Sequence, residues 1–302
     1  MEKKQELLKP KIDVVFHSIF RKGNERITKA LITSITKEKI EDIELDNDRY
    51  IIGKYPEEKL GILDLKATLD NGTICDIEIQ LADNKDTAER FLFYWSRIYS
   101  GQLVKGDDYG KLNKVIGIII LDYNLEKTKE IEQISTKWKI KEVTTGKEIV
   151  LTDVLELYII EIPKVKRILE KEPNDKLAQW VQFLDNPNEK EVLKAMENNE
   201  EIKEAMEELE EVSKIKQLRR IAELKDKAIR DEKNGLRHAT EDGINIGLER
   251  GRKEGIEEGE RKLKNEKIKI AKKLIKEGMD KEKISLIVGL SKEEIEKLSE
   301  EK

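Results

Sequence analysis

The feature that most constrains the fold is a pair of alternating apolar segments, GILDLKATLDNGTICDIEIQL, at residues 61–81. Asn71 and Gly72 between them are a strong hairpin signal. A two-residue loop would mix charged and apolar side chains on both faces of the pair. A three-residue loop, with Gly72 in the left-handed conformation, gives one almost wholly apolar face. Because one buried face fixes the register, the sequence predicts the three-residue loop.

This register also places carboxylates opposite each other. The polar face pairs Lys66 with Asp76 and Asp64 with Glu78. Two carboxylates directly across a sheet repel, and a divalent cation that bridges them reverses the penalty. Two interpretations therefore stand: a Mg²⁺ site built from oxygen ligands, or a solvated face whose charges partly pair, as Lys66 with Asp76. The pattern alone favours the solvated face.

Short apolar runs and one helical segment predict the rest of the domain. The runs at residues 115–121 and 154–162 are rich in Val, Ile and Leu, which suits strands. Phe91, Trp95 and Ile98 follow helical spacing within residues 87–104, which predicts an amphipathic helix. With a further helix near the start of the chain, this order predicts a mixed α/β domain.

The charge balance and the rare residues exclude several classes of protein. The 302 residues include 59 Lys and Arg against 64 Asp and Glu, a formal net charge of −5, which excludes a simple basic nucleic-acid-binding module. One cysteine and two histidines cannot form a four-ligand zinc site or a disulfide framework. No apolar stretch approaches the roughly 20 residues of a membrane span, and the start lacks a signal-peptide core. These features predict a cytoplasmic protein without a membrane segment.

The second half of the chain has a different composition. Residues 189–233 are dominated by Glu and Lys at helical spacing, for which a solvated helix is the default interpretation. Glycines then recur every fourth residue from Gly243 to Gly259. Each glycine in an exposed helix costs about 1 kcal/mol relative to alanine. Either another backbone packs along this stripe, or the segment is a flexible linker.

The last 35 or so residues regain an apolar pattern, which predicts three short helices. Gly278 and Gly289 end the first two, and Ser291 with Glu294 forms a capping box for the third. This arrangement is similar to a helix-turn-helix unit. The third helix, however, begins with acidic residues where a recognition helix would approach phosphates. The residues therefore favour an oligomerisation or partner-binding module over a DNA reader.

Asp64 followed by Glu78-Ile79-Gln80 resembles the PD-(D/E)XK nuclease superfamily. Together with this hairpin, the segments KPKIDVVFHSIF and FYWSRIYSGQLVKGDDYGKLNKVIGIIILDY resemble more closely the Rpn family of recombination-promoting nucleases, also called PD-(D/E)XK family transposases. Glycine-spaced tails are common in that family, so the resemblance favours a helix that packs against a second copy of the chain.

The resemblance implies a PD-(D/E)XK restriction-endonuclease-like mixed sheet flanked by helices, with an extended all-α C-terminal region. It also implies Mg²⁺-dependent DNA cleavage, with Asp64 and Glu78 as metal ligands. The chain departs from the superfamily pattern at Gln80, which stands where the superfamily has lysine. A glutamine amide can orient water or a phosphate oxygen, but it adds no positive charge.

Four further residues are candidates at this site. Lys66 can supply part of the missing charge, unless it pairs with Asp76. Asp13 matches a family position and is either an outer carboxylate of the site or an N-terminal helix cap. Arg90 and Arg97 lie on the less apolar side of the predicted helix, where they either contact DNA phosphates or form an ordinary solvated face.

We therefore expect a nuclease domain at residues 1–185, a charged helical and glycine-repeat segment at 186–262, and a three-helix module at 263–302. The predicted function is a Mg²⁺-dependent DNA endonuclease that forms a homo-oligomer through its C-terminal helices. Two alternatives remain: a catalytically silent relative acting as an interaction or inhibitory protein, and a DNA-binding regulator that uses the C-terminal helices. The missing lysine is the best argument for the silent relative.

Overall fold

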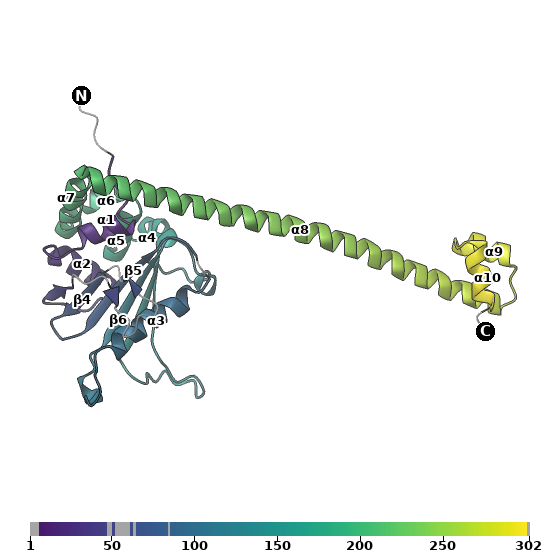
Figure 1. Ribbon diagram of the computed structural model, residues 1–302, viewed down its shortest axis with the longest axis horizontal. Helices are drawn as coiled ribbons and strands as arrows, with labels where there is room; N and C mark the ends of the chain where they lie inside the picture. Colours follow the sequence, from purple (N-terminus) through teal and green to yellow (C-terminus); the bar gives the residue numbers. More distant parts are fainter. Residues whose placement is uncertain (1–5, 47–49, 52–60, 63–64, 84, 301–302) are drawn as a thin grey trace, which may run out of the picture. The chain divides into compact units, whose positions relative to one another are not determined.

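The protein is built around a six-stranded mixed sheet (Figure 1). The structure is a computed structural model that describes residues 6–46, 50–51, 61–62, 65–83 and 85–300. In spatial order the strands of the sheet are β1 (Ile43–Leu45), β4 (Leu65–Leu69), β5 (Ile74–Gln80), β6 (Val115–Leu121), β8 (Leu155–Glu161) and β7 (Ser135–Trp138). A separate two-stranded ribbon consists of β2 (Tyr50–Ile51) and β3 (Gly61–Ile62). The mixed α/β prediction is confirmed.

Helices precede, interrupt and follow the sheet. They are α1 (Asp13–Ile19), α2 (Glu25–Thr36), α3 (Thr87–Ser100), α4 (Val165–Lys171), α5 (Lys176–Asp185), α6 (Lys190–Ala195), α7 (Glu200–Lys214), α8 (Lys216–Lys276), α9 (Lys281–Val288) and α10 (Lys292–Glu300). Three short 3₁₀ helices are η1 (Tyr109–Lys111), η2 (Glu126–Thr128) and η3 (Ile162–Lys164). The chain divides into two compact units, Met1–Glu232 and Lys233–Lys302. The division at residues 185 and 262 stays a prediction.

The hairpin between β4 and β5 has the three-residue loop that the sequence predicts. Leu65 lies opposite Ile77, and Lys66 lies opposite Asp76. The Leu69 amide donates to the Thr73 carbonyl at 2.8 Å, and Gly72 has a φ of 82°. Gly72 therefore adopts the left-handed conformation on which this register depends.

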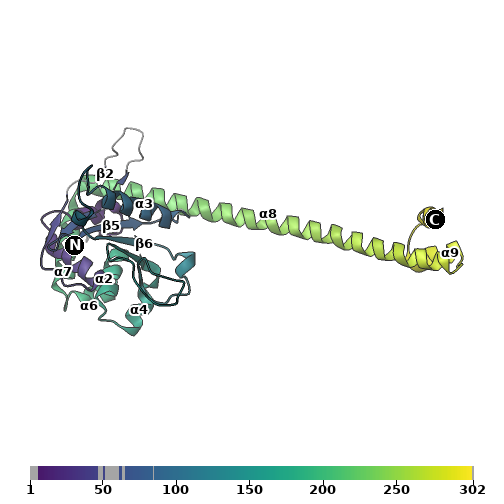
Figure 2. The ribbon, with the colours of Figure 1, turned by 90° about the horizontal axis from the view of Figure 1, so that it is seen from below.

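The two faces of the sheet are covered by different helices, as Figure 2 shows around β5 and β6. On one face, side chains such as Ile77, Ile118 and Ile160 are buried in the main core with residues of α1, α2, α5, α6 and α7. The other face is apolar over β6 and β8, where Phe91 of α3 packs on it. Strand alternation places Asp76, Glu78 and Gln80 of β5 on this α3 side.

The expectation of a solvated helix at residues 189–233 is wrong for α6 and α7. Their apolar residues Val192, Ile202, Met206 and Leu209 belong to the main core, and none is more than 4% exposed. The spacing of these residues is indeed too sparse for a core of their own. They complete the core formed by the sheet and the earlier helices instead.

The N-terminal segment is attached to the same late helices. The Leu8 amide donates to the Ser213 hydroxyl oxygen at 3.0 Å, and Arg21 forms an ion pair with Glu208 at 2.8 Å. Residues about 200 positions apart in sequence therefore close one unit.

The glycine repeat lies within helix α8, so the flexible-linker alternative is wrong. Among the described residues, no atom outside the helix's own neighbouring backbone lies within 4 Å of a β-carbon built at the glycines from Gly243 to Gly259. The stripe is therefore open along its length in the single chain. Packing against a second copy stays a prediction.

The second unit contains two of the three predicted short helices, α9 and α10, whereas the first is the C-terminal end of the long helix α8. The Asp280 carboxylate caps α9, and Gly289 ends it with a φ of 67°. Ser291 and Glu294 form the predicted capping box, with the Glu294 amide donating to the Ser291 hydroxyl oxygen at 3.2 Å. Ala271, Ile284 and Ile295 form a small core that joins α8, α9 and α10.

None of the described helices combines the length and the apolar character that a bilayer crossing requires.

Candidate active site

Three polar residues of β5 define the candidate site. Asp76 is fully buried, Glu78 is 7% exposed, and Gln80 is half-buried. They alternate along one strand, so all three lie on the α3 side of the sheet. The Gln80 amide nitrogen donates to the Ala82 carbonyl at 3.2 Å, which leaves the amide oxygen of Gln80 to act on a ligand. This strand therefore carries a row of oxygen donors into a partly buried region.

The predicted partner of Glu78 lies outside the described residues. In sequence, Asp64 comes immediately before Leu65, whose pairing with Ile77 is the last described pair of the ladder. The proximity of Asp64 to Glu78 stays a prediction. The register that motivates it is confirmed for the four described pairs.

Lys66 is placed opposite Asp76 in the ladder, but its ammonium group pairs with Asp46, at 2.8 Å. The Lys66 side chain is 29% exposed. The ion pair of Lys66 is therefore with Asp46, the residue after β1, and not with Asp76 as the cross-strand interpretation expected. Lys66 remains on the edge of the polar face and close to solvent.

Helix α3 approaches the sheet over a glycine. A β-carbon built at Gly117 would lie 2.8 Å from Cζ of Phe91. Gly117 is the neighbour of Asp76 in the parallel ladder between β5 and β6. The missing side chain thus lets α3 lie close on β6, the strand that pairs with the candidate strand β5.

The predicted phosphate-contacting residues form one stripe on α3. Arg90, Tyr94 and Arg97 are spaced by four and three residues, which places them on one side of the helix. Tyr94 of the stripe packs against the small cluster of Ile98 and Val115, and so does Ile74 of β5. Burial raises the pKa of the Tyr123 hydroxyl; its hydrogen bond with Thr87 and the charge of Arg90 oppose this rise. Arg90 therefore lies close to the end of β6.

Asp13 is the first residue of α1, whereas Ile12 occupies the N-cap position. The Asp13 carboxylate accepts a hydrogen bond from the Val14 amide at 2.7 Å and pairs with Lys225 of α8. The helix-cap interpretation is therefore wrong, because Ile12 and not Asp13 is the N-cap residue. The Asp13 carboxylate instead links α1 to α8 through Lys225. Its role as an outer carboxylate of the site stays a prediction.

Sequence reasoning missed a charged cluster at the end of the parallel strands. The Lys11 ammonium group pairs with Asp122 at 2.8 Å and with Asp185 at 2.7 Å. Burial lowers the pKa of Lys11, but the two carboxylates outweigh this effect and raise it. The Asp122 amide also donates to the Gln80 carbonyl at 3.0 Å. Lys11 thus ties the N-terminal segment and α5 to the end of the candidate strand.

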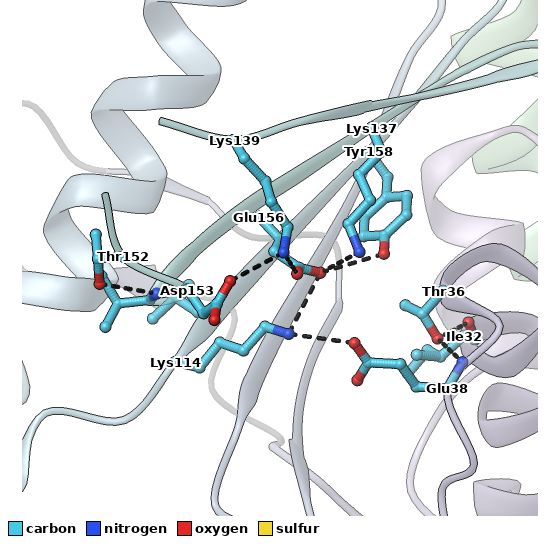
Figure 3. A network of polar contacts seen from close by, with 12 residues as sticks. Ile32, Thr36, Glu38, Lys114, Lys137, Lys139, Thr152, Asp153, Glu156 and Tyr158 are labelled. Carbon is cyan, nitrogen blue, oxygen red and sulfur yellow. Dashed lines mark hydrogen bonds and ion pairs between the residues drawn. The ribbon is translucent and has the colours of Figure 1, made fainter. Parts of the chain in front are cut away.

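A second missed cluster lies at the opposite end of the strands (Figure 3). Glu156 is 2% exposed, and its carboxylate pairs with Lys139 at 2.7 Å, Lys137 at 2.9 Å and Lys114 at 3.3 Å. Burial raises the pKa of Glu156, but the lysine contacts outweigh it and hold the pKa at about 2. Lys137 belongs to the edge strand β7, and Lys139 follows it directly. The Glu156 carboxylate of β8 therefore helps to hold β7 on the sheet.

The oxygen atoms on this face of β5 are of the chemical type that binds Mg²⁺. Carboxylate oxygens of Asp76 and Glu78 and the amide oxygen of Gln80 are hard ligands, which Mg²⁺ prefers. Within the described ranges, no three His, Cys, Asp or Glu side chains gather closely enough to hold a metal ion. Asp64 would be the next carboxylate on this face, and it lies outside those ranges.

Two family models match the chain. The model for the PD-(D/E)XK nuclease family transposase matches residues 10–239. The chain belongs to this family. A second model, the C-terminal HTH domain of the Rpn/YhgA-like nuclease family, matches residues 264–300. No curated protein and no solved structure matches the chain. The Rpn resemblance of the sequence is confirmed, and the mixed sheet is the one expected of a PD-(D/E)XK nuclease family member.

Asp76 is the buried polar residue of β5 that the sequence interpretation undervalued. Alternation along β5 already places Asp76 on the face of Glu78, which was the available signal. Its complete burial depends on the elements that pack over this face of β5, and the local sequence pattern does not indicate which elements those are.

Proposed function

We propose that this chain is a Mg²⁺-dependent DNA endonuclease that cleaves phosphodiester bonds with a metal-activated water. The observation that carries the proposal is the buried Glu78 on β5, followed by Gln80 on the same face, in a chain of a PD-(D/E)XK nuclease family. Family membership supports a nuclease type of function, and cleavage is the finer step that we propose.

The catalytic roles follow from the types of side chain. Asp64 and Glu78 would hold the metal, which lowers the pKa of bound water and stabilises charge on the phosphodiester. Gln80 would orient the water or a phosphate oxygen through its amide oxygen. Asp13 is proposed as an outer carboxylate of the site.

Three cationic residues would bind the substrate. Lys66 lies on β4 next to β5, and Arg90 and Arg97 lie on α3, which packs on the same face of the sheet over β6. Arginine and lysine contacts to phosphates position DNA without reading its sequence. Because the chain carries a net charge of −5, attraction to DNA must come from such local groups.

The test is nicking of supercoiled plasmid by the purified full chain with Mg²⁺. The wild type should convert the plasmid to open circles, and Asp64→Ala and Glu78→Ala should abolish this conversion. Glu44→Ala is a matched control, because Glu44 is an exposed carboxylate on β1 of the same sheet. Equal nicking by all variants, or none by any, would remove support for the catalytic proposal and leave the silent-relative alternative.

A second candidate is a DNA-binding regulator, which the match of residues 264–300 to an HTH domain favours. Truncation near Asp185 removes α6 and α7 from the core, so deletion of residues 264–302 is the cleaner variant. If this deletion abolished DNA binding and the full chain never cleaved, the regulator would replace the nuclease. We also propose self-association through the C-terminal helices, with the open glycine stripe of α8 as its surface.

A further inference from the structure

The second unit distributes its charge unevenly, and this unevenness bears on how it meets DNA. Helix α10 stands where an HTH recognition helix is expected, and it carries Glu293, Glu294, Glu296 and Glu300 against Lys292 and Lys297. Four carboxylates on nine residues repel a phosphate backbone. An HTH unit with this third helix does not present it to DNA at low electrostatic cost.

Lysines gather instead on the outer face of α8. Lys262, Lys269, Lys273 and Lys276 are spaced by seven, four and three residues, which places them on one side of a helix. All four are exposed. The opposite side of the same turns carries Ile268, Ala271, Leu274 and Ile275, which pack against α9 and α10. The lysine face therefore points away from the small core of the unit.

These outer lysines differ from the inner ones in their contacts. Lys264 pairs with Glu294 at 3.0 Å, and Lys267 donates to the Gly289 carbonyl at 3.4 Å, so both hold the unit together. Within the part of the chain that the structure describes, Lys269, Lys273 and Lys276 form no ion pair. Glu266 lies on the same face, four residues after Lys262 and three before Lys269, so the lysines outnumber the carboxylate there.

We propose that the C-terminal unit binds the phosphate backbone of duplex DNA through this lysine face of α8, with α10 turned away from the DNA. From Lys262 to Lys276 the face is about 21 Å long, since each helical residue rises 1.5 Å. Phosphates recur at about 3.4 Å along each strand, so the face spans several of them. The contact is sequence-independent, because lysine binds phosphate as a point charge.

An ordinary explanation accounts for part of the face. Lys273 and Lys276 lie in the last turn of α8, where cations stabilise the helix dipole. That role predicts a loss of thermal stability on substitution and no change in DNA binding. Lys262 lies outside the last turn and pairs with Glu258 at 2.9 Å, so Lys269 is the member of the face that neither role explains.

The proposal rests on the proposed DNA substrate but not on cleavage, so binding is measured without metal. Full-length wild type is titrated onto a fluorescent 30-base-pair duplex of arbitrary sequence, in EDTA, over a range of salt concentrations. The first variant combines Lys269→Gln, Lys273→Gln and Lys276→Gln. The matched control combines Lys281→Gln, Lys283→Gln and Lys297→Gln, which removes the same charge from exposed lysines of α9 and α10.

The expected result is a selective change in salt dependence. Each phosphate contact contributes about 0.9 to the slope of log affinity against log salt. The α8 variant should reduce that slope by about 2.7, and the control should leave it unchanged. Equal slopes in all three proteins, or a larger change in the control, would overturn the proposal. A dependence on the α8 lysines seen only with duplex RNA would overturn the assignment to DNA.

Discussion

Phe91 occupies the space beside Gly117 that a side chain on β6 would otherwise fill, with its Cζ atom 2.8 Å from where a β-carbon would lie. Leu157 of β8 approaches the same point to 3.0 Å. This contact sets how closely α3 lies on the sheet. It therefore also sets where Arg90 and Arg97 stand relative to β5.

Gly117→Ala should destabilise the first unit by about 1–3 kcal/mol, because the added methyl group overpacks a closed contact. The measurement is the urea midpoint of the full chain. Gly235→Ala on exposed α8 is the control, because no described atom outside the neighbouring helix backbone lies within 4 Å of its β-carbon position; it should not lower the midpoint. An unchanged midpoint for Gly117→Ala would contradict the packing described for α3.

Gly247→Ala with Gly251→Ala should stabilise α8. Each exposed glycine lowers helix stability by about 1 kcal/mol relative to alanine, and both positions are open in the single chain. Far-UV circular dichroism should show helical signal retained to a higher temperature. This result is expected at dilution, where the chain is alone; at concentrations where two chains associate through the stripe, as we propose, the added methyl groups should make the helix melt earlier. Earlier melting at dilution would contradict the open stripe of the single chain.

Glu156 should make the free energy of unfolding depend on pH in the acid range. Its pKa lies near 2 in the folded chain against an ordinary value of 4.5, so the charged carboxylate favours folding above pH 4.5. That contribution is lost as the pH falls from 4.5 towards 2. Glu156→Gln should cost about 2 kcal/mol at neutral pH, because three lysines lose their shared partner. In urea unfolding, the free energies of unfolding of the wild type and Glu156→Gln should become equal as the pH falls towards 2. A difference that stays constant with pH would contradict the lowered pKa of Glu156.

Gln80→Ala should lower the rate of plasmid nicking about 100-fold, because the oriented amide oxygen is lost. Gln80→Lys should retain measurable cleavage, since it restores the type of residue found in the wider superfamily. Initial rates at saturating Mg²⁺ provide the comparison. Cleavage by Gln80→Ala at the wild-type rate would exclude Gln80 from the site.

The elements that could be predicted from sequence are those with a strong local period. The hairpin register follows from the apolar face of Leu65 and Ile77, and α3 follows from Phe91, Trp95 and Ile98. Strand β1 was missed because its three residues, next to Asp42 and Asp46, are too few to show alternation. Helix α2 was missed because its β-branched residues, such as Ile27 and Thr28, do not favour helix locally.

The candidate site was predictable only in part for a related reason. Alternation tells which face of β5 Glu78 occupies, but not what covers that face. The partners of Lys11, Lys66 and Asp13 lie on elements distant in sequence, so no local pattern indicates them. Long-range ion pairs of this kind follow from the tertiary fold.

The attachment of Leu8 to Ser213 has a consequence for synthesis of the chain. A ribosome adds roughly 5–20 residues per second, so the N-terminal segment waits roughly 10–40 seconds for α7 to be made. During that time the hydrophobic side chains of α1 and α2 lack part of the core that buries them. A nascent chain therefore cannot complete the core around its candidate strand β5 until more than two thirds of it has been translated.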